Sequence, residues 1–224
     1  MDQENEKQLA AIEAVKLIRS GMTIGLGSGS TAAYMIIELG KKVSDGFKIR
    51  GVASSEHTEK LAMEAGIPII ALHKAKTIDI NIDGADEFDP YMQLIKGGGG
   101  ALLREKIIAF NSKYNVIIAD SGKKVMRLGK FKLPIETIPF ATKNIIDRLK
   151  KEGLKPILRK SNNEIYVTDE NNYIVDLDIL GHTNLGGLEE KLLKIPGIVE
   201  TGLFLETTNK IIIGHGDSTR TIER

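Results

Sequence analysis

Residues 22–42 read MTIGLGSGSTAAYMIIELGKK: a short apolar run, a glycine-rich loop and a longer amphipathic segment, in that order. The run at 22–27 has the length and composition of a short strand, and the segment at 30–42 is typical of a helix that begins at a Ser-Thr pair. A strand that passes through a glycine loop into a helix is the start of a βα unit. This stretch therefore predicts an α/β fold.

The same alternation of strands and helices continues outward from this unit. On both sides of it we predict helices at 5–19, 55–66 and 101–111, and strands at 47–54, 67–72, 77–83 and 114–120. Strands that alternate with helices of this length indicate a largely parallel sheet flanked by helices.

The pattern changes after about residue 128. Pro134 and Pro139 bracket a stretch that reads as a linker. After it we predict helices at 142–152 and 186–194, strands at 164–168 and 173–178, and strand-rich segments at 195–206 and 210–216. This order predicts a small α+β domain, inserted before the chain returns to the first sheet.

The composition excludes several classes of protein. The 224 residues contain 31 basic and 30 acidic side chains, no cysteine, no tryptophan and 5% aromatics. A net charge of +1 does not favour a general nucleic-acid binder, and the lack of cysteine excludes disulfides, zinc–thiolate sites and thiol nucleophiles. The polar start MDQENEKQLA and the absence of an apolar run of about 20 residues predict a soluble cytoplasmic protein with no membrane partner.

The first candidate loop is residues 25–31, GLGSGST. Glycines let the backbone N–H groups approach an anion, and the following helix start adds unpaired N–H donors. A dinucleotide fingerprint would need glycine where Ser30 stands, and a P-loop would need a Gly-Lys-Ser/Thr sequence. The loop therefore favours a phosphate or an oxygen-rich sugar, with a plain strand-to-helix turn as the alternative.

The second candidate loop is residues 83–87, DGADE, at the carboxyl end of a predicted strand, where ligands of α/β proteins bind. Residues 79–84 also match the start of a calcium loop, but Pro90 occupies the position of its closing glutamate. Magnesium binding by Asp83 and Asp86 is a weaker alternative, and a turn held by Asx hydrogen bonds is a stronger one.

The third candidate loop is residues 96–100, KGGGG, which leads directly into the predicted helix at 101–111. Helical side chains lean toward the N-terminus, so Glu105 is expected to lean back toward the glycines and is a candidate base. The alternative is a solvated surface glutamate.

The four histidines of the chain are not spaced as metal ligands would be. We read them as structural or surface residues: His57, His73, His182 and His215.

Blocks in these loops and beyond resemble one family. The blocks are GLGSGSTA (25–32), DGADE (83–87), KGGGGALLREKI (96–107), LGKF (128–131), LPIETIP (133–139) and IPGIVETGLF (195–204). Together, and in this order, they resemble type A ribose-5-phosphate isomerase over almost the whole chain.

The resemblance implies a fold and an activity. It implies a Rossmann-like catalytic domain of residues 1–127 and 205–224, and a ferredoxin-like lid or oligomerisation domain of residues 128–204. It further implies a homodimer or homotetramer, no metal and no cofactor. The implied reaction interconverts D-ribose 5-phosphate and D-ribulose 5-phosphate through an enediolate, in the non-oxidative pentose phosphate pathway.

The resemblance also implies residue roles. Glu105 would be the catalytic base, Asp83 and Asp86 would serve ring opening and hydroxyl proton movement, and Lys96 would stabilise the enediolate oxygens. Lys7 is a further candidate for a phosphate contact. The implied substrate-binding residues are Ser28, Gly29, Ser30, Thr31, Asp83, Gly84, Ala85, Asp86, Lys96, Gly97, Gly98, Gly99 and Lys123.

The sequence departs from the family pattern at two positions. Ser28 stands where the family commonly has threonine, and Arg220 where it tends to have lysine.

Three other functions stay open at this point. They are a sugar-phosphate sensor, another enzyme of related fold such as an amino-sugar phosphate deaminase or a CoA transferase, and a metal-dependent isomerase. A sensor would need a DNA-binding module, and residues 1–20 hold one predicted helix, too little for a helix-turn-helix.

Overall fold

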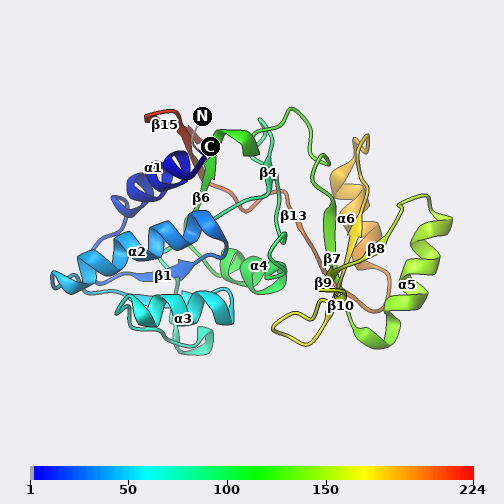
Figure 1. Cartoon of the computed structure of the whole chain (residues 1–224), viewed down its shortest axis with the longest axis horizontal. Helices are drawn as coiled ribbons and strands as arrows, with labels where there is room; N and C mark the ends of the chain where they lie inside the picture. The colour runs from blue at the N-terminus through cyan, green and yellow to red at the C-terminus, as the bar shows by residue number, and fades with distance from the viewer. Residues whose placement is uncertain (1–2) are drawn as a thin grey trace. The chain divides into compact units, whose positions relative to one another are not determined.

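The computed structural model describes residues 3–224, which divide into two compact units (Figure 1). Unit 1 comprises the chain up to Ala85, Arg104–Lys124 and Glu206–Arg224, and unit 2 comprises Asp86–Leu103 and Val125–Leu205. These bounds differ from the predicted ones, because residues 86–103 group with unit 2 and not with the first domain. The reason is a three-stranded antiparallel sheet, which is formed by β4 (Glu87–Phe88), β5 (Leu94–Ile95) and β13 (Leu203–Phe204).

Unit 1 is built on a six-stranded sheet in the order β15-β14-β6-β3-β1-β2. All neighbouring strands are parallel except the edge strand β15, which is antiparallel to β14. This mostly parallel sheet confirms the predicted fold class. The strands are β1 (Thr23–Leu26), β2 (Arg50–Ala53), β3 (Ile80–Asp83), β6 (Asn115–Asp120), β14 (Lys210–His215) and β15 (Ser218–Glu223).

Helices cover both faces of this sheet, as a parallel sheet requires. On one face Ile24 and Leu26 of β1 pack into a core with α1 (Gln3–Val15) and α2 (Ser30–Ser44). On the other face Ile108 of α4 (Leu102–Phe110) packs with Val52 and Ile78. The third helix, α3 (Glu56–Glu64), lies beside α2 (Figure 1). No helix among residues 3–224 has the length and apolar content to cross a membrane.

The helix predicted at 5–19 is α1, but it ends at Val15. Its buried residues are Glu6, Ala10, Ala11, Ala14 and Val15, whereas Ile12 is exposed. Small side chains are needed here because α1 approaches the sheet closely: a Cβ on Gly214 of β14 would overlap the backbone of Glu6.

The strand predicted at 67–72 is wrong. The segment forms only an isolated parallel bridge between Ile69 and Gly51, held by two backbone hydrogen bonds to Gly51, one donated and one accepted. Pro68 has no N–H with which to extend the pairing, and the chain then turns into the short 3-10 helix η1 (Leu72–Lys74).

Unit 2 has a β-α-β-β-α-β order with an antiparallel sheet, the ferredoxin-like arrangement that the resemblance implies. The sheet order is β12-β7-β11-β8, with a core of aliphatic side chains. Its elements are β7 (Leu133–Thr137), α5 (Pro139–Lys151), β8 (Ile157–Leu158), β11 (Tyr173–Leu177), α6 (Leu185–Leu193) and β12 (Ile198–Thr201). A separate pair, β9 (Lys160–Ser161) and β10 (Glu164–Ile165), follows β8 and accounts for part of the strand predicted at 164–168.

The linker predicted between Pro134 and Pro139 is also wrong, because this stretch contains the inner strand β7. Proline usually argues against an inner strand because it lacks an N–H. Here the carbonyl of Pro134 still accepts a hydrogen bond from Gly202 N at 2.7 Å. Pro139 lies at the first position of α5, where a missing N–H is harmless.

Candidate functional site

Two of the predicted loops, and the segment that carries Lys123, lie at one edge of the sheet of unit 1. The parallel registers align Leu26 of β1 with Ile82 of β3, and Asp83 of β3 with Ile117 of β6, so the carboxyl ends of these strands meet there. Residues 28–31 follow β1, residues 83–85 end or follow β3, and Lys123 ends the 3-10 helix η2 (Ser121–Lys123) that follows β6. This is the edge at which open α/β sheets bind ligands.

The first two loops are tied together by one carboxylate. Oδ1 of Asp83 accepts hydrogen bonds from the backbone N–H of Ser28 at 3.1 Å and from that of Gly84 at 2.7 Å. A Cβ at position 27 would lie 2.2 Å from the same oxygen, so only glycine fits there. Asp83 is 1% exposed. It therefore fixes the relative position of the loops after β1 and β3, in addition to any role in chemistry.

The start of α2 is open to a ligand. Gly29 precedes the helix with φ 93°, a left-handed conformation that glycine adopts without strain, and no side chain caps the helix. Gly29 and Ser30 are exposed, and Thr31 is buried at 8% exposure. The first N–H groups of a helix with this geometry favour an anion or an oxygen-rich group.

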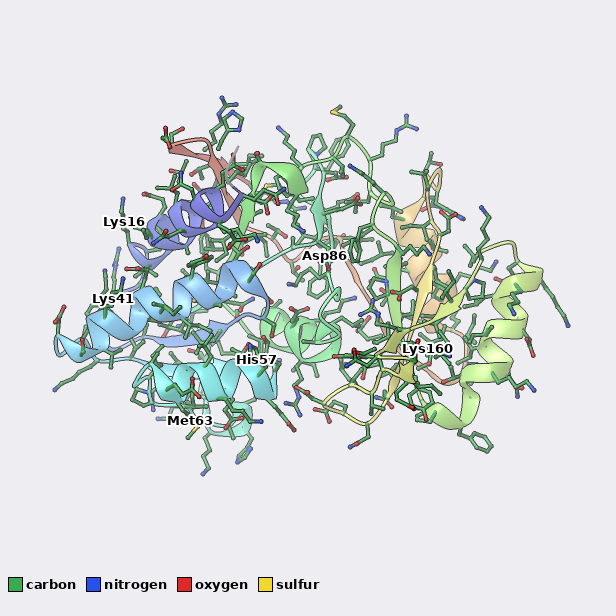
Figure 2. The ribbon with its side chains drawn as sticks, in the orientation of Figure 1. Lys16, Lys41, His57, Met63, Asp86 and Lys160 are labelled. Carbon is green, nitrogen blue, oxygen red and sulfur yellow. The ribbon has the colours of Figure 1, made fainter. Side chains whose placement is uncertain are left out.

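The hydroxyl of Ser28 belongs to a cluster that sequence reasoning missed. Its Oγ lies 2.7 Å from Ser54 Oγ, 2.9 Å from Ser55 Oγ and 3.1 Å from Thr58 Oγ1. Thr58 Oγ1 also donates to the carbonyl of Gly27 at 3.1 Å. The signal was available, because two serines directly follow β2 at the same sheet edge, and Ser55 caps α3. His57, labelled in Figure 2, marks the start of that helix.

The third loop, residues 96–100, lies in unit 2 with Asp86 (Figure 2). The N–H of Gly98 donates to Oδ2 of Asp86 at 2.7 Å, and a Cβ on Gly98 would lie 2.5 Å from Oδ1 of that carboxylate. The carbonyls of the same loop accept hydrogen bonds from Arg159 and Tyr166, neither of which the sequence analysis singled out.

Lys96 is buried at 3% exposure, with its ammonium group 5.5 Å from the centre of the Phe204 ring. This position over an aromatic face stabilises the positive charge. A buried cation beside a glycine loop is suited to meeting negative charge that develops on a substrate.

Glu105 lies in the first turn of α4, which begins two residues after Gly100. It is 5% exposed, so the alternative of a solvated surface glutamate is wrong. Glu105 belongs to unit 1, whereas the glycine loop at 96–100 belongs to unit 2.

The two candidate lysines differ in their surroundings. Lys123 is half-buried at the end of η2, whose start is capped by Asp120 through a 3.0 Å hydrogen bond from Gly122 N. Lys7 forms an ion pair with Glu4 at 2.6 Å on α1.

Asp79, where the partial match to a calcium loop begins, is bound by donors of the protein itself. The carboxylate of Asp79 accepts hydrogen bonds from Thr23 N at 3.0 Å and Lys113 Nζ at 2.9 Å, and these contacts, the backbone one first, lower the pKa of Asp79. Within residues 3–224 no three His, Asp or Glu side chains are grouped as a metal site. The four histidines are exposed or half-buried.

Comparison with known proteins identifies the family. Residues 50–218 match the family model of ribose 5-phosphate isomerase A (phosphoriboisomerase A). The chain belongs to this family. Ribose-5-phosphate isomerase A of Listeria monocytogenes is 49% identical over 209 residues, which cover 93% of each chain. The same enzyme of Limosilactobacillus reuteri is 48% identical over 217 residues, with 96% and 95% covered.

Solved structures of ribose-5-phosphate isomerases support the same family assignment. A D-ribose-5-phosphate isomerase in complex with phospho-erythronic acid matches with a TM-score of 0.96 and 40% identity over 100% of both chains. Ribose 5-phosphate isomerase A of Methanocaldococcus jannaschii matches with a TM-score of 0.92 and 37% identity, covering 97% of this chain and 98% of its own. These matches confirm the resemblance and the enzyme class. They disfavour the sensor, deaminase and transferase alternatives.

Proposed function

We propose that this chain interconverts D-ribose 5-phosphate and D-ribulose 5-phosphate through an enediolate, with Glu105 moving the proton between C2 and C1. The isomerase activity follows from membership of the family. The observation that supports the proton transfer is the burial of Glu105, at 5% exposure, in the first turn of the helix that follows the glycine loop. A carboxylate shielded from water is a stronger base than a solvated one.

The reaction moves two protons. Glu105 removes the proton on C2 of the open-chain aldose, and the electron pair shifts through the C1–C2 bond to the carbonyl oxygen O1. The hydroxyl proton on O2 then passes to O1. As the oxygen O2 forms a carbonyl with C2, the electron pair of the C1–C2 double bond takes the proton back from Glu105 at C1, which completes the ketose. A positioned acid–base group of this kind is worth about 10²–10⁴-fold in rate.

The negative charge of the enediolate needs donors close to O1 and O2. We assign this role to the buried ammonium of Lys96 and to backbone N–H groups of residues 97–99. Asp83 and Asp86 are assigned to ring opening and to the movement of hydroxyl protons. Donors that are already in place when the charge develops are the most effective electrostatic catalysts.

The remaining substrate oxygens are assigned to the sheet edge of unit 1. The uncapped start of α2, with Ser28, Gly29, Ser30 and Thr31, offers N–H and hydroxyl donors to the phosphate or to sugar oxygens. Gly84, Ala85 and Lys123 complete the proposed substrate contacts.

A ligand of one relative supports an anionic intermediate. The isomerase with a TM-score of 0.96 is in complex with phospho-erythronic acid. An aldonic acid ends in a carboxylate, so it presents two oxygens that share a negative charge, as the enediolate does. Binding of the same compound to this chain would fit a site made for that intermediate.

Several parts of the proposal rest on the family alone. These are independence from metal, a cytoplasmic location, a place in the pentose phosphate pathway, a lid role for residues 128–204 and assembly as a homodimer or homotetramer. Sedimentation of the purified enzyme tests its assembly as a homodimer or homotetramer. Fractionation of cells tests its cytoplasmic location.

The proposed chemistry is tested by isomerisation in deuterated water with EDTA present. The enediolate mechanism predicts that ribose 5-phosphate acquires deuterium at C2 and that EDTA leaves the rate unchanged, both followed by proton NMR. If ribose 5-phosphate and ribulose 5-phosphate equilibrate over many turnovers without any deuterium at carbon, the proposal of proton transfer through an enediolate is wrong. Loss of activity in EDTA would instead indicate a metal-dependent isomerase.

A further inference from the structure

Three carbonyl oxygens of the glycine loop in unit 2, those of residues 97–99, accept hydrogen bonds from the ferredoxin-like part of the same unit. Nη1 of Arg159 donates to the carbonyl of Gly97 at 2.7 Å and to that of Gly98 at 3.0 Å. The phenolic O–H of Tyr166 donates to the carbonyl of Gly99 at 2.8 Å. Lys160, labelled in Figure 2, directly follows Arg159.

These bonds also fix the direction of the loop's N–H groups. A trans peptide group is planar, with its C=O and N–H pointing in opposite directions, so holding one carbonyl orients the next residue's N–H. The N–H of Gly98 then reaches Asp86 at 2.7 Å, and the N–H of Gly100 reaches the carbonyl of Gly97 at 2.9 Å. The N–H of Gly99, between them, has no acceptor among residues 3–224.

The guanidinium of Arg159 is itself held in place. Nε and Nη2 of Arg159 donate to the two carboxylate oxygens of Asp176, with a distance of 3.0 Å for the Nε bond. The side chains of this pair are 13% and 18% exposed. A planar guanidinium bound by both oxygens of a carboxylate has one orientation, which a lysine ammonium cannot reproduce.

Tyr166 is suited to act as a donor. Burial, and the negative charge of Asp169, raise the pKa of its phenol, so the O–H stays protonated at neutral pH. The Arg159 guanidinium lies 5.9 Å from the centre of the ring. A Cβ on Gly100 would lie 2.3 Å from the phenolic oxygen, so the glycine at this position is required by Tyr166.

We propose that Arg159 and Tyr166 are positioning residues of the isomerase reaction, which hold the three carbonyls of residues 97–99 so that the N–H of Gly99 is presented to the enediolate. This inference rests on the proposed function. A flexible glycine loop would otherwise present carbonyl oxygens as readily as N–H groups, and a carbonyl oxygen would repel the developing negative charge.

The kinetic test uses Arg159→Lys and Tyr166→Phe, which keep charge and ring respectively. Arg159→Lys removes the planar guanidinium that bridges Asp176 and the loop carbonyls, and we expect kcat to fall about 10- to 100-fold. Tyr166→Phe removes one neutral hydrogen bond, and we expect kcat to fall about 5- to 10-fold. KM changes less than kcat in both variants, because the loop acts on the intermediate. Arg148→Lys on α5 and Tyr173→Phe on β11 are matched controls in the same unit and keep wild-type kcat.

The second test does not depend on activity. Hydrogen–deuterium exchange of a peptide covering residues 96–103 speeds up in Arg159→Lys and Tyr166→Phe and not in the controls, while exchange elsewhere in unit 2 stays as in the wild type. Unchanged exchange of this peptide overturns the inference, whether or not the wild type isomerises ribose 5-phosphate. Unchanged kcat in both variants of an active wild type overturns it too. An inactive wild type contradicts the proposed function alone.

Discussion

At the scale of single residues, the carboxylate of Asp83 and the glycine opposite it set the geometry of the sheet edge. The oxygen that would meet a Cβ at position 27 also accepts the N–H groups of Ser28 and Gly84. Two loops with different proposed tasks therefore depend on one contact, and a single methyl group is enough to disturb both.

Gly27→Ala tests this contact. The added Cβ would lie 2.4 Å from the Cα of Asp83, so the backbone must shift, and we expect a loss of about 1–3 kcal/mol in the free energy of unfolding. Activity falls as well, since the loops move apart. Urea unfolding and the isomerase assay measure the two effects.

The control for this variant is Gly186→Ala on α6, where no atom lies within 4 Å of the added Cβ. That variant should be neutral or more stable by about 0.5–1 kcal/mol, because alanine loses less backbone entropy in a helix. Equal stability of the two variants would contradict the close approach of Gly27 and Asp83.

At the scale of elements, α1 is attached through Glu6 to the edge of the sheet at which the substrate is proposed to bind. Its carboxylate accepts hydrogen bonds from Gly216 N, from Ser121 N and from Ser121 Oγ, at 2.9, 2.9 and 2.7 Å, and the residue is 1% exposed. The Gly216 bond, followed by those from Ser121, lowers the pKa of Glu6 from its ordinary value of 4.5. Ser121 begins η2, so α1 helps to hold the element that ends at Lys123.

Glu6→Gln should therefore change the dependence of stability on pH. A carboxyl group whose pKa is lower in the folded state stabilises the fold above its unfolded value, and this contribution is lost as the pH falls through the folded value. At pH 7 we expect the variant to be less stable by about 1–3 kcal/mol. The difference should shrink below pH 4.5, as denaturant melts at several pH values would show. A difference that stays constant down to pH 3 would contradict the role of the charged carboxylate.

The order of elements in unit 1 could be predicted from the sequence, because each strand and helix there has a local signal. The errors arose where packing overrides such signals. Pro134 suggested a linker, yet β7 is an inner strand whose proline is used only as an acceptor. Residues 67–72 have the composition of a strand but make a single bridge, since Pro68 cannot donate.

In the candidate site too, local features could be predicted from the sequence and long-range contacts could not. Glycine runs at strand ends are local, so all three loops could be found in the sequence. The residues that hold those loops are distant in the chain: Arg159 is 62 residues from Gly97, and Ser28 is 26 from Ser54. Nothing near Arg159 in the sequence indicates which carbonyls it will meet. Only the folded unit reveals that partnership.

At the scale of the whole molecule, the residues proposed for catalysis divide between the two units. Asp83, Glu105 and Lys123 belong to unit 1, and Asp86 and Lys96 to unit 2. The chain passes between the units at four points, after Ala85, Leu103, Lys124 and Leu205. Three of these passages lie within or beside the proposed site residues: one between Ala85 and Asp86, one inside α4 and one directly after Lys124. Membership of the isomerase family supports their action on one substrate.

The proton transfer by Glu105 is the central claim, and turnover of Glu105→Gln tests it most directly. Glutamine keeps the size of the side chain but cannot accept the C2 proton. We predict that kcat falls by about 10²–10⁴-fold, with the circular dichroism spectrum and the melting temperature close to those of the wild type. Glu59→Gln, an exposed glutamate in the first turn of α3, should turn over at the wild-type rate. A folded Glu105→Gln enzyme that interconverts ribose 5-phosphate and ribulose 5-phosphate as fast as the wild type would contradict the account.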